Sequence, residues 1–202
     1  PTFHRVRAID IDGDGKPEVV MAPLMGRDAT KEKNWMDGRP VRVVSYRVPA
    51  KDPEKAENWK PEVLSDELHV VHNFWPYTPP GDQSPMSIIT ASYEGYSAII
   101  LGKNGNKHTT KQVHEGDQST PTASRGASEI RSGSINPDPK PLNKADGAVV
   151  ATVEPWHGNS IVVYSRAVGE KPTRTVVDDQ LRWGHAVTFA EGGEKVSALE
   201  IT

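Results

Sequence analysis

An acidic segment near the start of the sequence, DIDGDGKPE at residues 10–18, carries the most specific chemical signal. It places Asp10, Asp12 and Asp14 at alternate positions, and Glu18 supplies a fourth carboxylate. Ca²⁺ takes about six to eight oxygen ligands, so it suits carboxylates that are crowded into one tight turn. Without a cation these carboxylates would repel one another. The segment therefore predicts a structural Ca²⁺ site, with a solvated acidic turn that holds no ion as the alternative.

Histidines recur at the starts of similar β-rich segments. His4, His72 and His185 lie at or beside three such starts, and the corresponding segment between the last two contains Glu129 and Arg131. If these starts converge, imidazoles, a carboxylate and a guanidinium would share one pocket. That cluster suits a divalent metal such as Zn²⁺, held by neutral imidazoles, or proton transfer near neutral pH. A hydrogen-bonded structural role for each histidine is the alternative.

A further candidate is the segment EPWHGN at residues 154–159, which contains His157. It follows a buried-looking strand at 148–153, and Tyr93 occupies the same place one unit earlier. Proline, tryptophan, histidine and glycine together favour a rigid loop with an aromatic platform and a titratable tip. An aromatic face suits the apolar face of a sugar ring. This loop is therefore a second candidate for ligand binding.

The elements that must position these groups are short β-strands in a degenerate repeat. The unit starts at residues 4, 72, 128 and 185 are separated by 68, 56 and 57 residues. Each of the first three units contains four β-branched runs bounded by Gly, Pro, Asn or Asp. Four strands at this period form the blade of a β-propeller, and the first strand of each blade lines the central channel. The unit starts are therefore predicted to converge on one axis.

The predicted fold class is thus all-β, a β-propeller of four-stranded antiparallel blades. The units run over residues 3–68, 69–124, 125–182 and 183–202, and the last one is incomplete. Propellers close with about four to eight blades, so about three and a half blades are expected to be a fragment of a larger ring. The remaining blades are expected outside this chain. An irregular β-sandwich is the alternative.

Composition excludes several classes of protein. The 202 residues include 17 Gly and 17 Pro, which argues against a helical bundle. A net charge of -3 gives no electrostatic reason to expect nucleic acid. Apolar runs of only about four or five residues predict no membrane span. The chain contains no cysteine, so it has no disulfide, thiolate metal site or cysteine nucleophile.

The acidic segment looks like the calcium loop of FG-GAP or VCBS-type propeller repeats, in which an Asp-rich hairpin joins the first two strands of a blade. It differs from an EF-hand loop, because Met21 stands at the twelfth position, where a bidentate Glu belongs. The flanking residues 6–9 and 19–21 are also typical of strands and not of helices. We expect this ion to brace the hairpin and to take no part in a reaction.

Four other segments together resemble the propeller domain of fungal aldos-2-ulose dehydratase and related bacterial FG-GAP proteins. They are HNF at 72–74, GASEIR at 126–131, ATVEPWHGN at 151–159 and GHA at 184–186. The resemblance covers most of residues 3–200. It implies a seven-bladed propeller that eliminates water from 1,5-anhydrofructose and related osuloses. It also implies a divalent metal near the mouth of the central tunnel.

The implied reaction removes a proton next to a carbonyl and expels a β-leaving group. Propeller lyases that cleave polysaccharides use the same steps on uronates. Both need a base, an acid for the leaving oxygen, and a cation or donor that stabilises the enolate. The resemblance assigns base or metal-ligand roles to His72, His157 and His185, a ligand or orienting role to Glu129, enolate or substrate-oxygen stabilisation to Arg131, and a candidate acid role to Tyr93.

The alternative function is a non-catalytic, calcium-braced propeller module that binds glycan or protein. A metal held by imidazoles at the propeller centre would favour the enzyme, and a tunnel mouth without one would favour the module. The expected partner is a carbohydrate substrate or ligand, and for the module a glycan or a protein. The expected location is extracellular or periplasmic.

Overall fold

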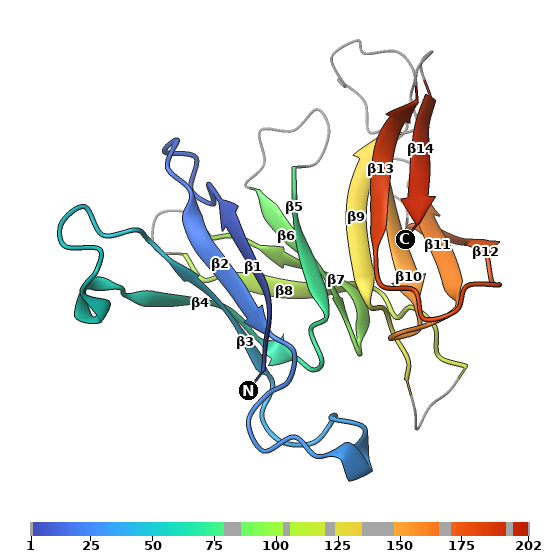
Figure 1. The fold of residues 1–202 in the computed structure, drawn as a ribbon, viewed down its shortest axis with the longest axis horizontal. Coiled ribbons are helices and arrows are strands. Elements are labelled where there is room, and N and C mark those ends of the chain that lie inside the picture. The colour runs from blue at the N-terminus through green and yellow to red at the C-terminus, as the bar shows by residue number, and fades with distance from the viewer. Residues whose placement is uncertain are drawn as a thin grey trace.

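The structure is a computed structural model that describes residues 2–78, 86–102, 106–119, 124–134, 148–165, 171–192 and 196–201. Within these residues it consists of β-strands with two single-turn 3-10 helices, η1 (Lys31–Lys33) and η2 (Ala56–Asn58). The strands form three four-stranded antiparallel sheets and one two-stranded antiparallel sheet (Figure 1). No helix in the described ranges is long and apolar enough to cross a membrane.

Each sheet is built from consecutive strands, so every neighbouring pair is a hairpin connection. The first sheet contains β1 (Phe3–Ile9), β2 (Glu18–Pro23), β3 (Val41–Tyr46) and β4 (Pro61–Leu68). The second contains β5 (Asn73–Tyr77), β6 (Ser87–Ser92), β7 (Gly95–Ile100) and β8 (Thr109–His114). The third contains β9 (Glu129–Ser134), β10 (Ala148–Glu154), β11 (Ser160–Ser165) and β12 (Thr173–Asp178). The last contains β13 (Val187–Gly192) and β14 (Val196–Ile201).

Burial changes across each blade in the way that the strand sequences require. The middle strands β6 and β10 read SIITAS and AVVATVE, and almost all of their residues are buried on both faces. Continuous β-branched and small residues suit a strand that is covered on both sides. The outer strands β8 and β12 carry Lys, Gln and Arg, and neither has a buried residue. The second and third blades are thus apolar at the centre and polar at the rim, whereas β4, the outer strand of the first blade, keeps Leu64 and Leu68 buried.

The sheets pack face to face, with their first strands side by side. Figure 1 shows β1, β5, β9 and β13 in neighbouring positions from the blue to the red end of the chain. One apolar core joins the first and second sheets and includes Val43 and Phe74, and another joins the second and third sheets and includes Ile89 and Ile130. A third packs Val187 of β13 onto the third sheet. The predicted all-β, propeller-type fold with four-stranded antiparallel blades is therefore confirmed.

The core between the first two sheets provides a test of this packing. Phe74 is fully buried there, so Phe74→Ala should lower the free energy of unfolding by about 3–5 kcal/mol, because it removes apolar contacts and leaves a cavity. Val6 lies on the neighbouring strand and is 57% exposed, so Val6→Ala should change it by less than about 0.5 kcal/mol. Chemical denaturation measures both values. Equal effects of the two substitutions would contradict the burial of Phe74 between the first two sheets.

Candidate functional site

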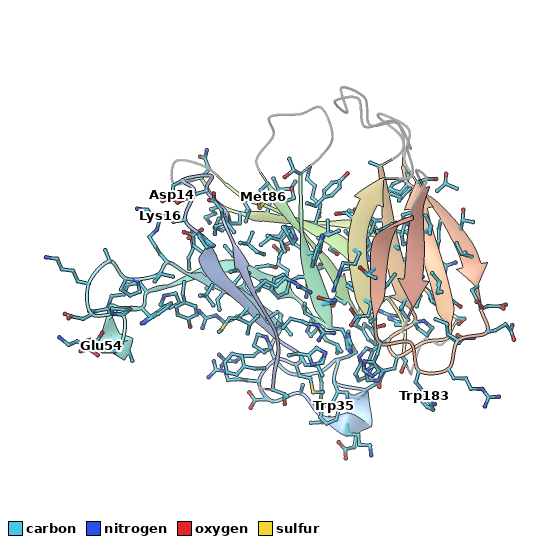
Figure 2. The ribbon with its side chains drawn as sticks, turned by 45° about the horizontal axis from the view of Figure 1, so that its top comes forward. Asp14, Lys16, Trp35, Glu54, Met86 and Trp183 are labelled. Carbon is cyan, nitrogen blue, oxygen red and sulfur yellow. The ribbon has the colours of Figure 1, made fainter. Side chains whose placement is uncertain are left out.

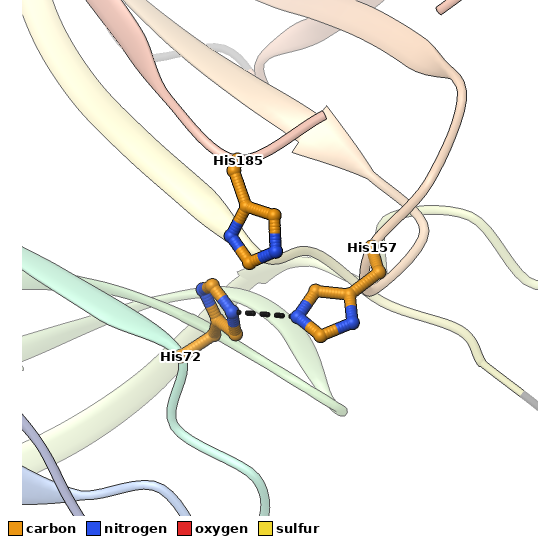
Figure 3. Close-up of side chains that lie close together, drawn as sticks. All are labelled: His72, His157 and His185. Carbon is orange, nitrogen blue, oxygen red and sulfur yellow. Dashed lines mark hydrogen bonds between the residues drawn. The ribbon is translucent and has the colours of Figure 1, made fainter. Parts of the chain in front are cut away.

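Three imidazoles meet where the first strands of the second, third and fourth sheets begin. They belong to His72, directly before β5, to His157, in the loop between β10 and β11, and to His185, two residues before β13 (Figure 3). One ring nitrogen from each lies within 4.8 Å of the other two, and the Nε2 atoms of His72 and His157 are 3.0 Å apart. His72 is buried, His157 is half-buried and His185 is exposed. The cluster therefore reaches from the interior to solvent.

The backbone around these imidazoles is held in conformations that side chains seldom adopt. Val70 (φ 48°), His157 (φ 53°) and Trp183 (φ 60°) all lie in the left-handed region, where residues other than glycine are uncommon. Each lies within two residues of an imidazole of the cluster or belongs to it. Such strain costs free energy and persists where the surrounding structure enforces it, which is a feature of functional sites.

Two hydrogen bonds tie the loops of His157 and His185 together. The Gly184 amide donates to the Gly158 carbonyl at 3.1 Å, and the Leu181 amide donates to the Asn159 carbonyl at 3.0 Å. Position 158 must be glycine, because a Cβ atom there would lie 2.2 Å from the carbonyl group of Glu154. The close approach of backbone segments therefore sets the distance between these two imidazoles.

The orientation of His72 follows from its hydrogen bonds. Its Nδ1 lies 3.0 Å from the carbonyl oxygen of Ser128, which can only accept a hydrogen bond, and 3.1 Å from Oε1 of Glu129. Nδ1 therefore carries the proton, and the lone pair of Nε2 points into the cluster. This arrangement, with the second nitrogen held by a carbonyl or carboxylate, is typical of metal-binding histidines.

Glu129 is a buried carboxylate that is shared by three sheets. It accepts hydrogen bonds from Arg5 of β1 (2.6 Å), from the side chain of Asn73 at the start of β5, and from His72. Burial alone would raise the pKa of Glu129, but the hydrogen bond from His72 and the charge of Arg5 hold it below its ordinary value. Three donors occupy its oxygens, so the geometry favours the orienting role over the ligand role.

The surroundings favour the neutral form of two imidazoles, those of His157 and the neighbouring His4. Burial, together with repulsion from His72 and His185, lowers the pKa of His157. The ring of His4 lies 4.4 Å from that of His72, and burial and repulsion from His72 lower the pKa of His4 to about 4. Since neutral imidazole is the form that binds a metal, this electrostatic environment suits a cation.

Arg131 and Tyr93 lie beside the imidazole cluster. Arg131 lies two residues after Glu129 on β9. Its guanidinium stacks on the indole of Trp75, 4.2 Å from the ring centre. The ring of Tyr93 packs in an apolar cluster against Trp156, under the guanidinium of Arg125. Trp156 in turn stacks on His157, with ring centres 4.9 Å apart. An acid role for Tyr93 stays a prediction.

The acidic segment forms the turn between β1 and β2, and Figure 2 shows its Asp14 at the opposite end of the sheets from Trp183. Oxygens of Asp10, Asp12 and Glu18 lie within 4.8 Å of one another. Arg47 pairs with Asp12, with Asp14 at 3.1 Å and with Glu18 at 3.7 Å. The structure thus gathers three of the four predicted carboxylates and adds a guanidinium, which sequence reasoning had not included.

Arg5 and Arg7 are the other residues that sequence reasoning missed. Arg5 reaches Glu129, and Arg7 stacks on Trp75. The only signal in the sequence is their alternation on the first strand, which places both on one face of β1. Their partners lie 124 and about 68 residues away, so nothing local identifies them.

The fold and the site define a β-propeller-type protein with a histidine cluster at the ends of its inner strands. Residues 1–167 match the family of aldos-2-ulose dehydratase β-propeller domains, and the chain belongs to this family. The search of curated proteins found no match. The predicted resemblance to this propeller domain is confirmed.

A buried network anchors the strand that leads into the His157 loop. Glu154, the last residue of β10, is fully buried and accepts two hydrogen bonds from Arg174 (2.9 and 2.8 Å). Tyr164 and Thr152 also donate to it. Burial and the Glu154 charge raise the pKa of Tyr164, so this hydroxyl remains a donor. The carboxylate is thereby fixed three residues before His157.

Arg174→Met should therefore lower the free energy of unfolding by about 3–5 kcal/mol, because it leaves the buried carboxylate of Glu154 without its cation. The matched control is Arg42→Met, since Arg42 is exposed on β3 and its loss should change stability by less than about 0.5 kcal/mol. Urea denaturation of the two variants makes the comparison. Similar stabilities for both variants would show that the network does not hold the loop.

Proposed function

We propose that this chain contributes to the active site of a carbohydrate-active lyase that removes water from a sugar by β-elimination. The substrate is an osulose of the anhydrofructose type or a uronate. The observation that carries the proposal is the meeting of three imidazoles from three separate segments, beside a buried, ionised carboxylate. Membership of the aldos-2-ulose dehydratase propeller family supports a dehydration of this kind.

The imidazole cluster fits a divalent metal such as Zn²⁺. Catalytic zinc sites use three protein ligands and keep a further position open, and the nitrogens of His72, His157 and His185 are close enough to share one ion. Glu129 acts behind His72, where it would fix the ring and increase its basicity. When bound, the metal would polarise the sugar carbonyl and stabilise the charge that develops on its oxygen.

Side chains of this protein would then accept the proton that the reaction removes from the carbon next to the carbonyl. In the elimination, a C–H bond next to the carbonyl breaks, its electron pair forms the new C=C bond, and the β C–O bond breaks. The proton passes to a base, and the leaving oxygen takes up a proton and departs as water. His185 is the exposed imidazole of the cluster, so it either completes the metal ligand set or accepts this proton.

Metal content and activity can be measured on the same variants. After equilibration with Zn²⁺, the protein should hold about one ion per chain, and His157→Ala should lose most of it. His185→Ala should also abolish dehydration of 1,5-anhydrofructose: loss of zinc makes His185 a ligand, and retained zinc makes it the base. Without zinc, both variants should keep nearly the wild-type melting temperature, because bound metal itself stabilises the folded state.

His108→Ala is the control, because His108 lies directly before β8 and pairs with Glu62 of β4. It should leave zinc content and activity unchanged. Folded His157→Ala and His185→Ala variants with full activity would refute the proposed reaction.

The acidic turn supports a second candidate function, a calcium-braced module that binds glycan or protein. Burial is the main cause that raises the pKa of Glu18, and the charges of Asp12 and Asp14 add to it. A cation at this point would relieve that repulsion. Arg47 already supplies one positive charge, so Ca²⁺ would have to compete with its guanidinium.

Calcium should therefore raise the melting temperature, and Asp12→Ala should abolish that rise. Arg47→Ala should enlarge it, because the competing guanidinium is gone. Asp66→Ala, an exposed carboxylate on β4, should leave the response as in the wild type. Differential scanning calorimetry with and without Ca²⁺ measures all four proteins. A wild-type melting temperature that does not respond to Ca²⁺ would remove the case for this site.

A further inference from the structure

Three guanidiniums gather along the inner strands of the first and third sheets. Arg5 and Arg7 project from one face of β1, and Arg131 projects from β9. Strand β5 lies between β1 and β9, as Figure 1 shows. Arg7 follows Arg5 by two positions on β1, and Arg131 follows Glu129 by two positions on β9, so the positive charges extend along the inner strands from the level of Glu129.

Only one of the three guanidiniums has an ion pair with a carboxylate within the part of the chain that the structure describes. Glu129 forms its ion pair with Arg5. Arg7 donates to two neutral acceptors, the Phe74 carbonyl (2.9 Å) and the Asn73 side-chain oxygen (3.1 Å). Arg131 donates to the carbonyl of Ile130 at 2.8 Å. Neither Arg7 nor Arg131 has an ion pair with a carboxylate among the described residues.

Both of these arginines stack on the same indole. The guanidinium carbon of Arg7 lies 4.5 Å from the ring centre of Trp75, and that of Arg131 lies 4.2 Å from it. Burial and the charges of Arg131 and Arg5 lower the pKa of Arg7 to about 10, which leaves it charged at neutral pH. The ring attracts the two cations, yet it does not neutralise them. The stack therefore holds two like charges in position for an anion.

We propose that Arg7 and Arg131 bind the carboxylate of an acidic sugar, so that this site takes a uronic acid or a uronate-containing saccharide in preference to a neutral sugar. A guanidinium matches the planar carboxylate with two parallel hydrogen bonds. Trp75 contacts both guanidiniums and so helps to hold their forks in place. The inference rests on the proposed function, because it takes the ligand of the imidazole cluster to be a sugar.

The substrate class can be tested by calorimetric titration of the purified, zinc-equilibrated protein with D-glucuronate, D-glucose and inorganic phosphate. Glucuronate should bind at least about tenfold more tightly than glucose or phosphate. Arg7→Gln and Arg131→Gln should each weaken glucuronate binding by about tenfold or more. Arg131→Lys should weaken it less, because the charge remains while the planar fork is lost.

The matched control is Arg42→Gln, which removes an exposed guanidinium on β3 and should leave glucuronate affinity unchanged. Melting temperatures identify any variant that fails to fold. If a glutamine variant does not fold, the affinity of Arg131→Lys for glucuronate is the test instead. Equal affinity for glucuronate and glucose, phosphate binding as tight as glucuronate binding, or wild-type affinity in the two glutamine variants would overturn the inference.

Zinc content, measured on the same samples, separates this inference from the proposed function. If the protein binds zinc through the imidazoles but shows no preference for glucuronate, the metal site is supported and the acidic-sugar inference is contradicted. A preference for glucuronate that depends on Arg7 and Arg131, in a protein without a zinc site, would support the inference and contradict the proposed metal-assisted reaction.

Discussion

The buried carboxylate of Glu129 is the interaction on which the candidate site depends. It lies at the start of β9 and receives hydrogen bonds from Arg5 of the first sheet and from Asn73 and His72 at the start of the second. A carboxylate removed from water is costly unless it is paired and hydrogen-bonded. Glu129 therefore needs all of these partners. Since Glu129 and its partners belong to three blades, the relative position of these blades is coupled to the orientation of the His72 imidazole.

The imidazole cluster is assembled around this fixed point by strained loops. His157 and the residues two positions before His72 and His185 adopt left-handed backbone conformations, and hydrogen bonds join the two loops that carry His157 and His185. The Glu154 network fixes the end of β10 in the same region. Packing of the apolar blade cores supplies the stability that can hold such unfavourable conformations. The site is thus rigid at its buried side and open at His185.

Charge is distributed unevenly over the described part of the chain, although the whole chain carries a net charge of only -3. Carboxylates gather at the turn between β1 and β2, where Arg47 partly balances them. Guanidiniums gather along the inner strands, where Glu129 balances only one of them. The imidazoles lie at the same end of the inner strands as Glu129. The ligands proposed above follow this separation, with a cation at the turn and an anionic sugar beside the guanidiniums.

The sequence by itself determined the strands and their grouping into blades. Period-2 patterns and turn residues are local, so runs such as SIITAS at 87–92 identify strands without any tertiary information. Because the first strands of propeller blades converge, the sequence also predicted that His72, Glu129 and His185 lie close together. The tertiary structure alone decided the pairing of Arg5 with Glu129, the insertion of Arg47 among the carboxylates and the stack of two arginines on Trp75. Those contacts join residues that are far apart in the chain, and they depend on the angle and spacing at which whole sheets pack, which no local pattern encodes.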